Sequence, residues 1–191
     1  RATLEANGWE TIEAPPADWS NPQRDGTRVR PMRDTTYCVT DVSHSWNGSQ
    51  RQYNNGAMDG FVTTNNPEGE RAMAYLEEAD LPFYYDLAGA FAIADHYHAS
   101  LLGPTMPNRF YMMGASSYGL IHNRLVLPDT RATPVDNLYL RLEAAGFQWK
   151  DYAGGARPLG LFPYFGVQRL ETRPHLATLD QLTEDLRTGN L

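Results

Sequence analysis

The sequence has little cysteine, no excess of positive charge and no long apolar run. Cys38 is its single cysteine, which excludes an internal disulfide and any paired-cysteine metal knuckle. The formal net charge of −7 excludes a general basic field for anionic lipid, and we expect no nucleic-acid partner. No apolar stretch is long enough to span a bilayer. The chain opens Arg1-Ala2-Thr3 without the apolar segment of a signal peptide.

What is present is typical of a globular protein. The chain has 191 residues, of which 41% are hydrophobic and 12% aromatic. That length is enough for one domain with a sizeable core, and that composition is too apolar for a disordered segment. We therefore expect residues 1–191 to belong to a single domain.

Periodic patterns predict an α/β fold. Gly146 lies where a helix C-cap belongs, between an amphipathic helix and a following strand, and this order is that of an α/β unit. Phe83, Leu87 and Phe91 fall at helical spacing, which predicts a helix face against a core. Cys38 is expected to be a small buried residue. The predicted helices are 70–79, 83–94, 134–145 and 179–186, and the predicted strands are 35–40, 95–102 and 147–152.

The segment from Asp95 to Gly119 carries the most informative turn. Gly103-Pro104-Thr105 leads from an apolar segment into a residue run that favours a helix, so Thr105 falls at the helix start. Its hydroxyl has two interpretations. It can cap the helix by accepting a backbone N–H. It can also act as a nucleophile, because a helix N-terminus favours a phosphate group.

Histidines supply two further candidates. His44 follows a predicted strand and has Asp41 three residues earlier, so it is either a site residue or a loop histidine held by that carboxylate. His96 and His98 would point to one side of a strand, which suits a metal ligand pair. Without a third ligand nearby, two packed or surface histidines are the favoured interpretation of that pair.

Several motifs in order resemble the bacterial phosphoesterase family, which holds phosphocholine-type phospholipases C and certain acid phosphatases. The motifs are Asp41-Val42-Ser43-His44-Ser45-Trp46, then Gly60-Phe61, then LPFYYDLAGAFAIADHYHASLLGPTMPNRFYMMGASSYG, and later LEAAGFQWKDY. Agreement of several motifs in the same order is far more specific than one short motif. The resemblance extends over most of residues 37–191.

The resemblance implies the alkaline phosphatase superfamily, with a three-layer α/β sandwich of which this chain forms part. It implies that Thr105 is the nucleophile and a ligand of a divalent metal ion, with a covalent phospho-threonine intermediate. It assigns His44 to a phosphoryl oxygen or to protonation of the leaving group. Asn108 and Arg109 are candidates for phosphate contacts or for support of the turn. In this geometry Thr105 and His44 are expected to approach each other.

The family's N-terminal and distal metal-ligand segments have no match in this sequence. We therefore expect an internal fragment of a larger enzyme, with most metal ligands supplied by the remainder of the enzyme or by a complementing chain. Isolated, the chain should bind metal poorly and turn over little. The resemblance also implies a secreted or periplasmic protein that makes transient contact with a membrane surface.

The predicted function is that of a metal-dependent phosphoesterase. A phospholipase C acting on phosphodiesters such as phosphatidylcholine is favoured, because the GPTMPNR form of the turn is similar to that side of the family. An acid phosphatase of the same family is one alternative. A truncated, non-catalytic binding protein is the other, and in that case Thr105→Ala should leave function untouched.

Overall fold

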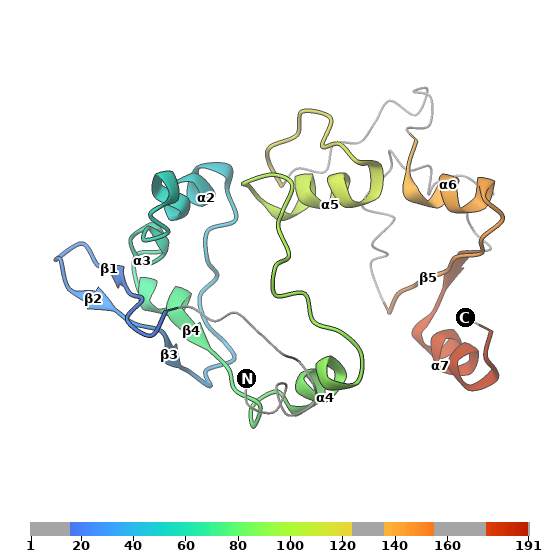
Figure 1. Ribbon diagram of the computed structural model, residues 1–191, viewed down its shortest axis with the longest axis horizontal. Coiled ribbons are helices and arrows are strands. Elements are labelled where there is room, and N and C mark those ends of the chain that lie inside the picture. Colours follow the sequence, from blue (N-terminus) through green and yellow to red (C-terminus); the bar gives the residue numbers. More distant parts are fainter. Residues whose placement is uncertain (1–15, 124–135, 155–174, 191) are drawn as a thin grey trace. The chain divides into compact units, whose positions relative to one another are not determined.

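The computed structural model describes residues 16–123, 136–154 and 175–190. The chain divides into two compact units, Arg1–Gly103 and Pro104–Leu191, which are described separately (Figure 1). Helices and short strands occur in both units, and this mixture is consistent with the predicted α/β class. Among the described helices, none has the length and apolar character needed to cross a membrane.

The first unit joins short strands to short helices. Strands β1 and β2 form an antiparallel pair with Asn21 opposite Val29, and β3 pairs in parallel with β4 through Met32 and Ala74. Its elements are β1 (Asn21–Pro22), β2 (Arg28–Val29), β3 (Met32–Arg33), α2 (Trp46–Tyr53), η1 (Asn54–Gly56), α3 (Phe61–Thr64), η2 (Gly69–Met73), β4 (Ala74–Tyr75) and α4 (Pro82–Ala90).

Helix α3 is the centre of packing in this unit. Val62 and Met73 are buried where α3 meets η2, and a Cβ on Gly69 would lie 2.1 Å from the Val62 carbonyl oxygen. The fully buried Asn21 fastens β1 to the α3 segment, because its Oδ1 accepts from Phe61 N at 2.8 Å and its Nδ2 donates to the Met58 carbonyl at 3.3 Å. Close main-chain contact and amide hydrogen bonds therefore join these elements.

The described part of the second unit contains helices α5, α6 and α7 and one pair of short strands. Phe110 on α5 is buried and meets the Tyr118 ring edge-on, with 6.4 Å between centroids. Asn137 caps α6 by accepting from two backbone N–H groups, and Gly146 takes φ of +80° after that helix, as predicted for a C-cap. The elements are α5 (Thr105–Gly114), α6 (Leu138–Ala144), β5 (Asp151–Tyr152), β6 (Leu176–Ala177) and α7 (Leu179–Thr188).

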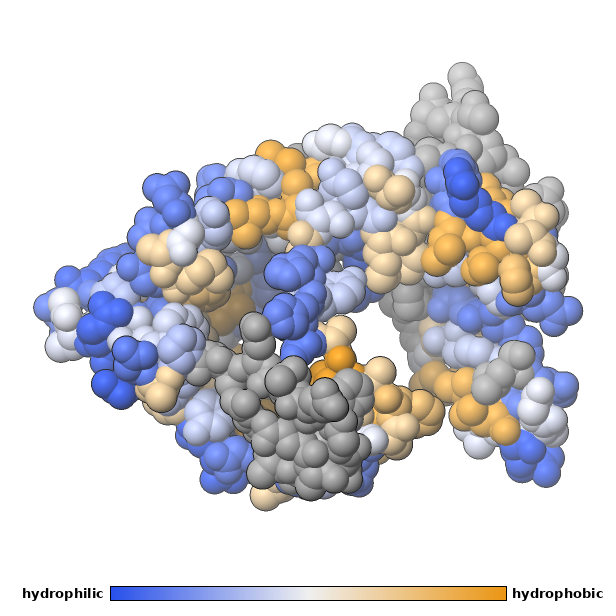
Figure 2. All heavy atoms as spheres, viewed as in Figure 1, coloured by the Kyte–Doolittle hydropathy of each residue, from blue (hydrophilic) through white to orange (hydrophobic). Residues whose placement is uncertain are grey.

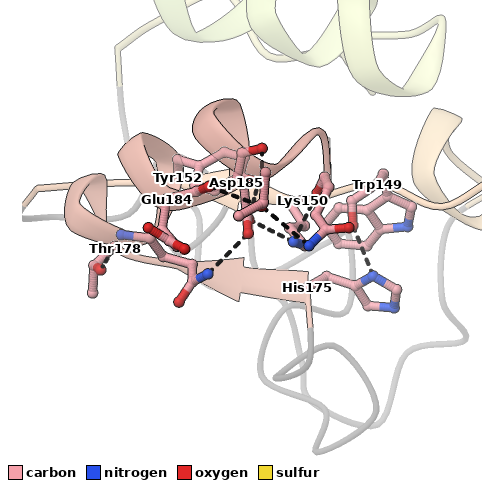
Figure 3. A network of polar contacts seen from close by, with 10 residues as sticks. Trp149, Lys150, Tyr152, His175, Thr178, Glu184 and Asp185 are labelled. Atoms are coloured by element: carbon pink, nitrogen blue, oxygen red, sulfur yellow. Dashed lines mark hydrogen bonds and ion pairs between the residues drawn. The ribbon is translucent and has the colours of Figure 1, made fainter.

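A buried carboxylate joins β5 to α7 (Figure 3). Asp185 Oδ2 accepts from Lys150 Nζ at 2.5 Å and from the Tyr152 hydroxyl at 2.6 Å, while Oδ1 accepts from Gln181 Nε2 at 2.9 Å. The hydrogen bonds from Lys150, Tyr152 and Gln181, in that order, lower the pKa of Asp185 to about 2. The hydrogen bond between Lys150 and Asp185 also raises the pKa of Lys150.

Trp149, the residue before Lys150, forms an aromatic cluster with His175 and Tyr139. The His175 ring stacks on Trp149 with 4.2 Å between centroids, and Tyr139 on α6 meets the same indole at 4.5 Å. Glu143 Oε1 accepts from Trp149 Nε1 and lies 3.1 Å from His175 Nε2. These contacts connect α6 to the start of β6, so the helix–glycine–strand prediction is confirmed, with a strand limited to Asp151–Tyr152.

Three predicted elements are wrong. Residues 35–40 and 95–102 form no strand. Near the first of these ranges the strand is β3, which lies earlier, at Met32–Arg33, and pairs with β4. The expected helix over residues 70–79 is instead η2 followed by β4. Ala74–Tyr75 favours a helix by local propensity but pairs as a strand with the distant β3. A local sequence pattern cannot predict that pairing. Residues 134–135 of the predicted helix over residues 134–145 lie outside the described residues.

Helix α4 forms close to the prediction, but its apolar side does not face a core within the described residues. Phe83 is 68% exposed and Phe91 76%, and Leu87 is also exposed. Figure 2 shows orange and tan spheres over parts of α4 and α6. Cys38 is exposed as well, so its expected burial is also wrong.

Candidate functional site

Thr105 is the first residue of helix α5, and its side chain is exposed. The helix N-cap is Pro104, whose extended backbone has φ −76° and ψ 178°, and no side chain makes a capping hydrogen bond. The capping interpretation of Thr105 is therefore not realised. The Thr105 hydroxyl lies in the first turn of α5 and makes no capping hydrogen bond to that helix.

The N-terminus of α5 retains few of the donors that usually make such an end an anion site. Pro104 and Pro107 have no N–H, and Met106 N donates to Asn123 Oδ1 at 2.9 Å. Among the described residues, the N–H of Thr105 itself is the remaining donor of the first turn. Any backbone contribution to a phosphoryl group here comes from the residue that carries the candidate nucleophile.

Asn108 and Arg109 differ in what they contact. Asn108 Nδ2 donates to the Pro104 carbonyl at 3.0 Å and so supports the turn that presents Thr105. The side chain of Arg109 is exposed, and within the described ranges no hydrogen bond or ion pair involves it. The turn interpretation fits Asn108, while Arg109 remains available to an anionic group.

His44 is an exposed loop residue held by Asp41. Its Nε2 lies 2.9 Å from Asp41 Oδ1. A carboxylate accepts hydrogen bonds, so Nε2 carries a proton and Nδ1 is the nitrogen directed elsewhere. The hydrogen bond from His44, followed by that from the Val42 N–H, lowers the pKa of Asp41.

Two residues that the sequence did not single out hold this loop. Arg71 donates to the carbonyls of Thr40 at 2.6 Å and Asp41 at 2.9 Å, and also to that of Asn65 at 2.9 Å. The buried Asn65 accepts from Ser43 N through Oδ1 at 2.7 Å. A single sequence gives no signal for the contacts that Arg71 and Asn65 make with residues 40–43, because these join segments more than 20 residues apart.

The residues after His44 explain part of the motif around it. Ser45 caps α2 by accepting from Gly48 N at 3.0 Å. A Cβ on Gly48 would lie 2.0 Å from Ser43 Oγ, so glycine is required by close approach. The His44 loop therefore enters α2 through a compact serine turn.

The described residues do not by themselves fit a divalent metal site. No group of three or more His, Cys, Asp or Glu side chains gathers in the described part of the chain. Thr105 supplies one exposed oxygen there. His96 and His98 lie in an exposed, non-strand segment, so the side-by-side placement expected of a strand is not formed.

Thr105 and His44 fall in different units. Thr105 begins α5 in the second unit, and His44 precedes α2 in the first. Their expected approach stays a prediction.

Comparison with known proteins defines the class. A model of the Phosphoesterase family matches residues 2–188, and the chain belongs to this family. Phospholipase C B of Mycobacterium tuberculosis is 34% identical over 160 residues, covering 76% of this chain and 30% of that protein. A non-hemolytic phospholipase C of Burkholderia pseudomallei is 35% identical over 121 residues, covering 60% and 16%. A hemolytic phospholipase C of Pseudomonas aeruginosa is 40% identical over 75 residues, covering 39% and 10%. The chain thus spans less than a third of the length of each of these relatives.

Proposed function

We propose that the protein carrying this chain is a phospholipase C-type phosphoesterase that hydrolyses phosphodiesters such as phosphatidylcholine. The observation that carries this proposal is the family match over residues 2–188, together with relatives that are named phospholipases C. The exposed hydroxyl of Thr105, uncommitted to capping α5, is compatible with the role of nucleophile. Because the chain spans only part of those relatives, the reaction is assigned to a protein that contains the remaining catalytic segments.

The reaction proceeds in two displacements. Thr105 Oγ attacks phosphorus, the bond from phosphorus to the glycerol oxygen breaks, and that oxygen leaves as diacylglycerol with a proton from Nδ1 of the imidazolium form of His44, which keeps its Nε2 proton on Asp41. The hydroxyl proton of Thr105 is lost to a base or to solvent. Water then attacks the phospho-threonine, phosphocholine departs, and the Thr105 hydroxyl forms again. The N–H of Thr105 and the positive end of α5 favour charge on the phosphoryl oxygens.

Metal dependence is part of the proposal and is supported by family membership. A divalent ion, with Thr105 among its ligands, would supply Lewis-acid chemistry when bound. The described residues form no metal cluster on their own, so the steps above are assigned only to this chain's side chains. Family membership likewise supports an alkaline-phosphatase-like three-layer sandwich, a secreted or periplasmic location and transient contact with a lipid surface.

The test is hydrolysis by a protein that contains this chain within a whole catalytic domain. We expect release of phosphocholine from phosphatidylcholine to exceed release of phosphate from phosphomonoesters, and the reverse ratio would indicate the acid phosphatase. Thr105→Ala should lower turnover on the order of 10³-fold or more, because it removes the nucleophile. Thr183→Ala, at an exposed helix position of the same unit, is the control and should be active.

Two results would contradict the proposal. Full activity of Thr105→Ala would remove the covalent mechanism. Absence of turnover in every complete form, with lipid or partner binding retained, would leave the non-catalytic alternative. The chain of 191 residues alone is expected to hydrolyse little, and Thr105-dependent turnover by it would contradict that expectation.

A further inference from the structure

A polar pocket of about 550 Å³ lies within the first unit. That volume is in the range of small-ligand sites. The pocket lies between the β1–β2 turn, the end of α2 and helix α3, and it includes none of Thr105, His44, Asn108 and Arg109. Its lining residues with polar side chains are Arg24, Arg51, Asn54, Asp59, Thr63 and Thr64.

Two arginines give this pocket a local positive charge in an acidic chain. Arg24 and Arg51 both line the pocket. Within the described ranges neither side chain makes a hydrogen bond or an ion pair. Asp59 is the one acidic lining residue, and its Oδ1 already accepts from Asn54 Nδ2 at 2.7 Å. Arg51 in the last turn of α2 also suits the negative end of that helix. Helix electrostatics does not account for Arg24, which lies outside any helix.

The part of the pocket wall that carries Arg51 and Asp59 is closely packed around Gly60. A Cβ on Gly60 would lie 1.9 Å from the Arg51 carbonyl oxygen, and Gly60 N donates to the Gln52 carbonyl at 3.2 Å. The buried Asn21 holds Phe61 N on the other side of Gly60. The backbone that carries Arg51 and Asp59 is therefore held in place before any ligand binds, which lowers the ordering cost of binding.

The pocket also contains a buried hydroxyl with unmet hydrogen-bonding capacity. Thr64 Oγ1 is buried, and no partner for it exists among the described residues. Buried hydroxyls are normally paired, and this one is an exception within a residue of the pocket lining. Thr63, next to it in the lining, has its hydroxyl on the Gly60 carbonyl at 3.3 Å.

From these features we propose that the pocket binds a phosphate group between Arg24 and Arg51, either as a soluble phosphomonoester or as a lipid head group. Guanidinium groups present paired donors that match the oxygens of phosphate, and two of them can neutralise a dianion. Binding at this pocket does not require that Thr105 catalyse any reaction.

Titration calorimetry of the 191-residue chain with inorganic phosphate and with phosphocholine tests the soluble source. Co-sedimentation with phosphatidylcholine vesicles, with and without phosphatidic acid, tests the lipid source. We expect Arg24→Gln and Arg51→Gln each to weaken binding about tenfold, since each removes a charge-assisted contact. The double variant should abolish it. Arg30→Gln, an exposed arginine outside the pocket, is the matched control and should bind as the parent chain does.

Each outcome of the two binding assays either supports or contradicts phosphate binding at this pocket. Arginine-dependent binding of soluble phosphate identifies the free phosphomonoester, and arginine-dependent binding of acidic vesicles alone identifies the lipid head group. Binding that the double variant retains, or no binding to either probe, overturns the proposal. Both arginines are exposed, and unchanged thermal unfolding of the variants would show that lost binding is not lost folding. Because no turnover is measured, failure here is separate from failure of the phosphoesterase reaction.

Discussion

Arg71 connects two separate loops through their carbonyl oxygens. On one side lie Thr40 and Asp41, just before His44, and on the other lie Asn65 and Pro67, with the Pro67 carbonyl at 2.8 Å. The planar guanidinium can reach all of them because its donors fan out in fixed directions. It therefore holds the backbone of the loop that carries the Asp41–His44 pair.

Replacing Arg71 with lysine should destabilise the chain by about 1–3 kcal/mol, since an ammonium cannot satisfy the same carbonyls. Urea unfolding should show a lower midpoint at unchanged slope. Arg30→Lys, at an exposed position, is the control and should stay within about 0.5 kcal/mol. Equal stability of the Arg71 and Arg30 variants would show that this clamp contributes nothing.

Asp185 makes the second unit sensitive to acid. Its pKa falls from 3.8 to about 2 on folding, so its stabilising contribution is complete above pH 4 and is lost as the pH falls towards 2. Asp185→Asn should lower the melting temperature at neutral pH, and the gap from the parent chain should narrow on acidification. Asp180→Asn, an exposed site on the same helix, is the control. A gap that is constant from pH 7 to pH 2 would contradict the assignment.

Among individual residues, the sequence identified those with chemical side chains and missed those that hold them. Thr105 and His44 stood out by residue type and by motif order. Arg71 and Asn65 did not, because their roles consist of contacts across 20 or more residues. Gly48 and Gly60 lie within or near quoted motifs, yet only the structure shows that a side chain would meet Ser43 at the first position and the Arg51 backbone at the second.

At the level of elements, local patterns predicted helices better than strands. Helices α6 and α7 formed because their apolar spacing, caps and terminal glycines agree with one another. Each strand in the described residues is two residues long, and β3 and β5 depend on partners distant in sequence, so the β-branched run at residues 35–40 did not suffice to make one. The exposed apolar side of α4 shows that helical periodicity predicts a helix but not what covers it.

The packing of α3 against α2 gives an element-level prediction. Gly60 has φ of −91°, so alanine there is not strained by its backbone angle, but its Cβ would meet the Arg51 carbonyl at 1.9 Å. Gly60→Ala should push the two helices apart and destabilise the chain by about 1–3 kcal/mol. Chemical denaturation measures this loss. Gly154→Ala is the control, because its new Cβ meets only the terminal methyl of the flexible Leu179 side chain. Equal stability of the two variants would contradict a rigid α2–α3 contact.

For the whole molecule, the division into two units separates the two candidate catalytic residues along the chain. The first unit holds His44 on a clamped loop, and the second holds Thr105 on a proline-rich helix start. Each unit therefore brings one reacting group on its own scaffold. If both groups serve one reaction, a change in the first unit must alter the covalent chemistry at Thr105 in the second.

This dependence can be measured with His44→Ala in a protein that contains the complete catalytic domain. If His44 protonates the leaving oxygen, the variant should lose about 10²–10⁴-fold on phosphatidylcholine, the usual range for a general acid. With p-nitrophenyl phosphocholine, the first turnover, measured as the initial release of nitrophenolate, should lose far less, because nitrophenolate leaves without a proton. The same imidazole would then assist water in the second displacement, so the phosphocholine adduct of Thr105 should accumulate in the variant and be found by peptide mass spectrometry.

The control for that experiment is His122→Ala, which removes an exposed histidine from the second unit and should change neither substrate's turnover. Equal losses by His44→Ala in the first turnover of both substrates, with no adduct on Thr105, would contradict a leaving-group role for His44. An adduct on another residue would remove Thr105 as the nucleophile while leaving the family assignment intact. Accumulation on Thr105 that depends on a histidine from the other unit would show that the two units contribute to a single active site, since an intermediate persists only when its own breakdown has been slowed.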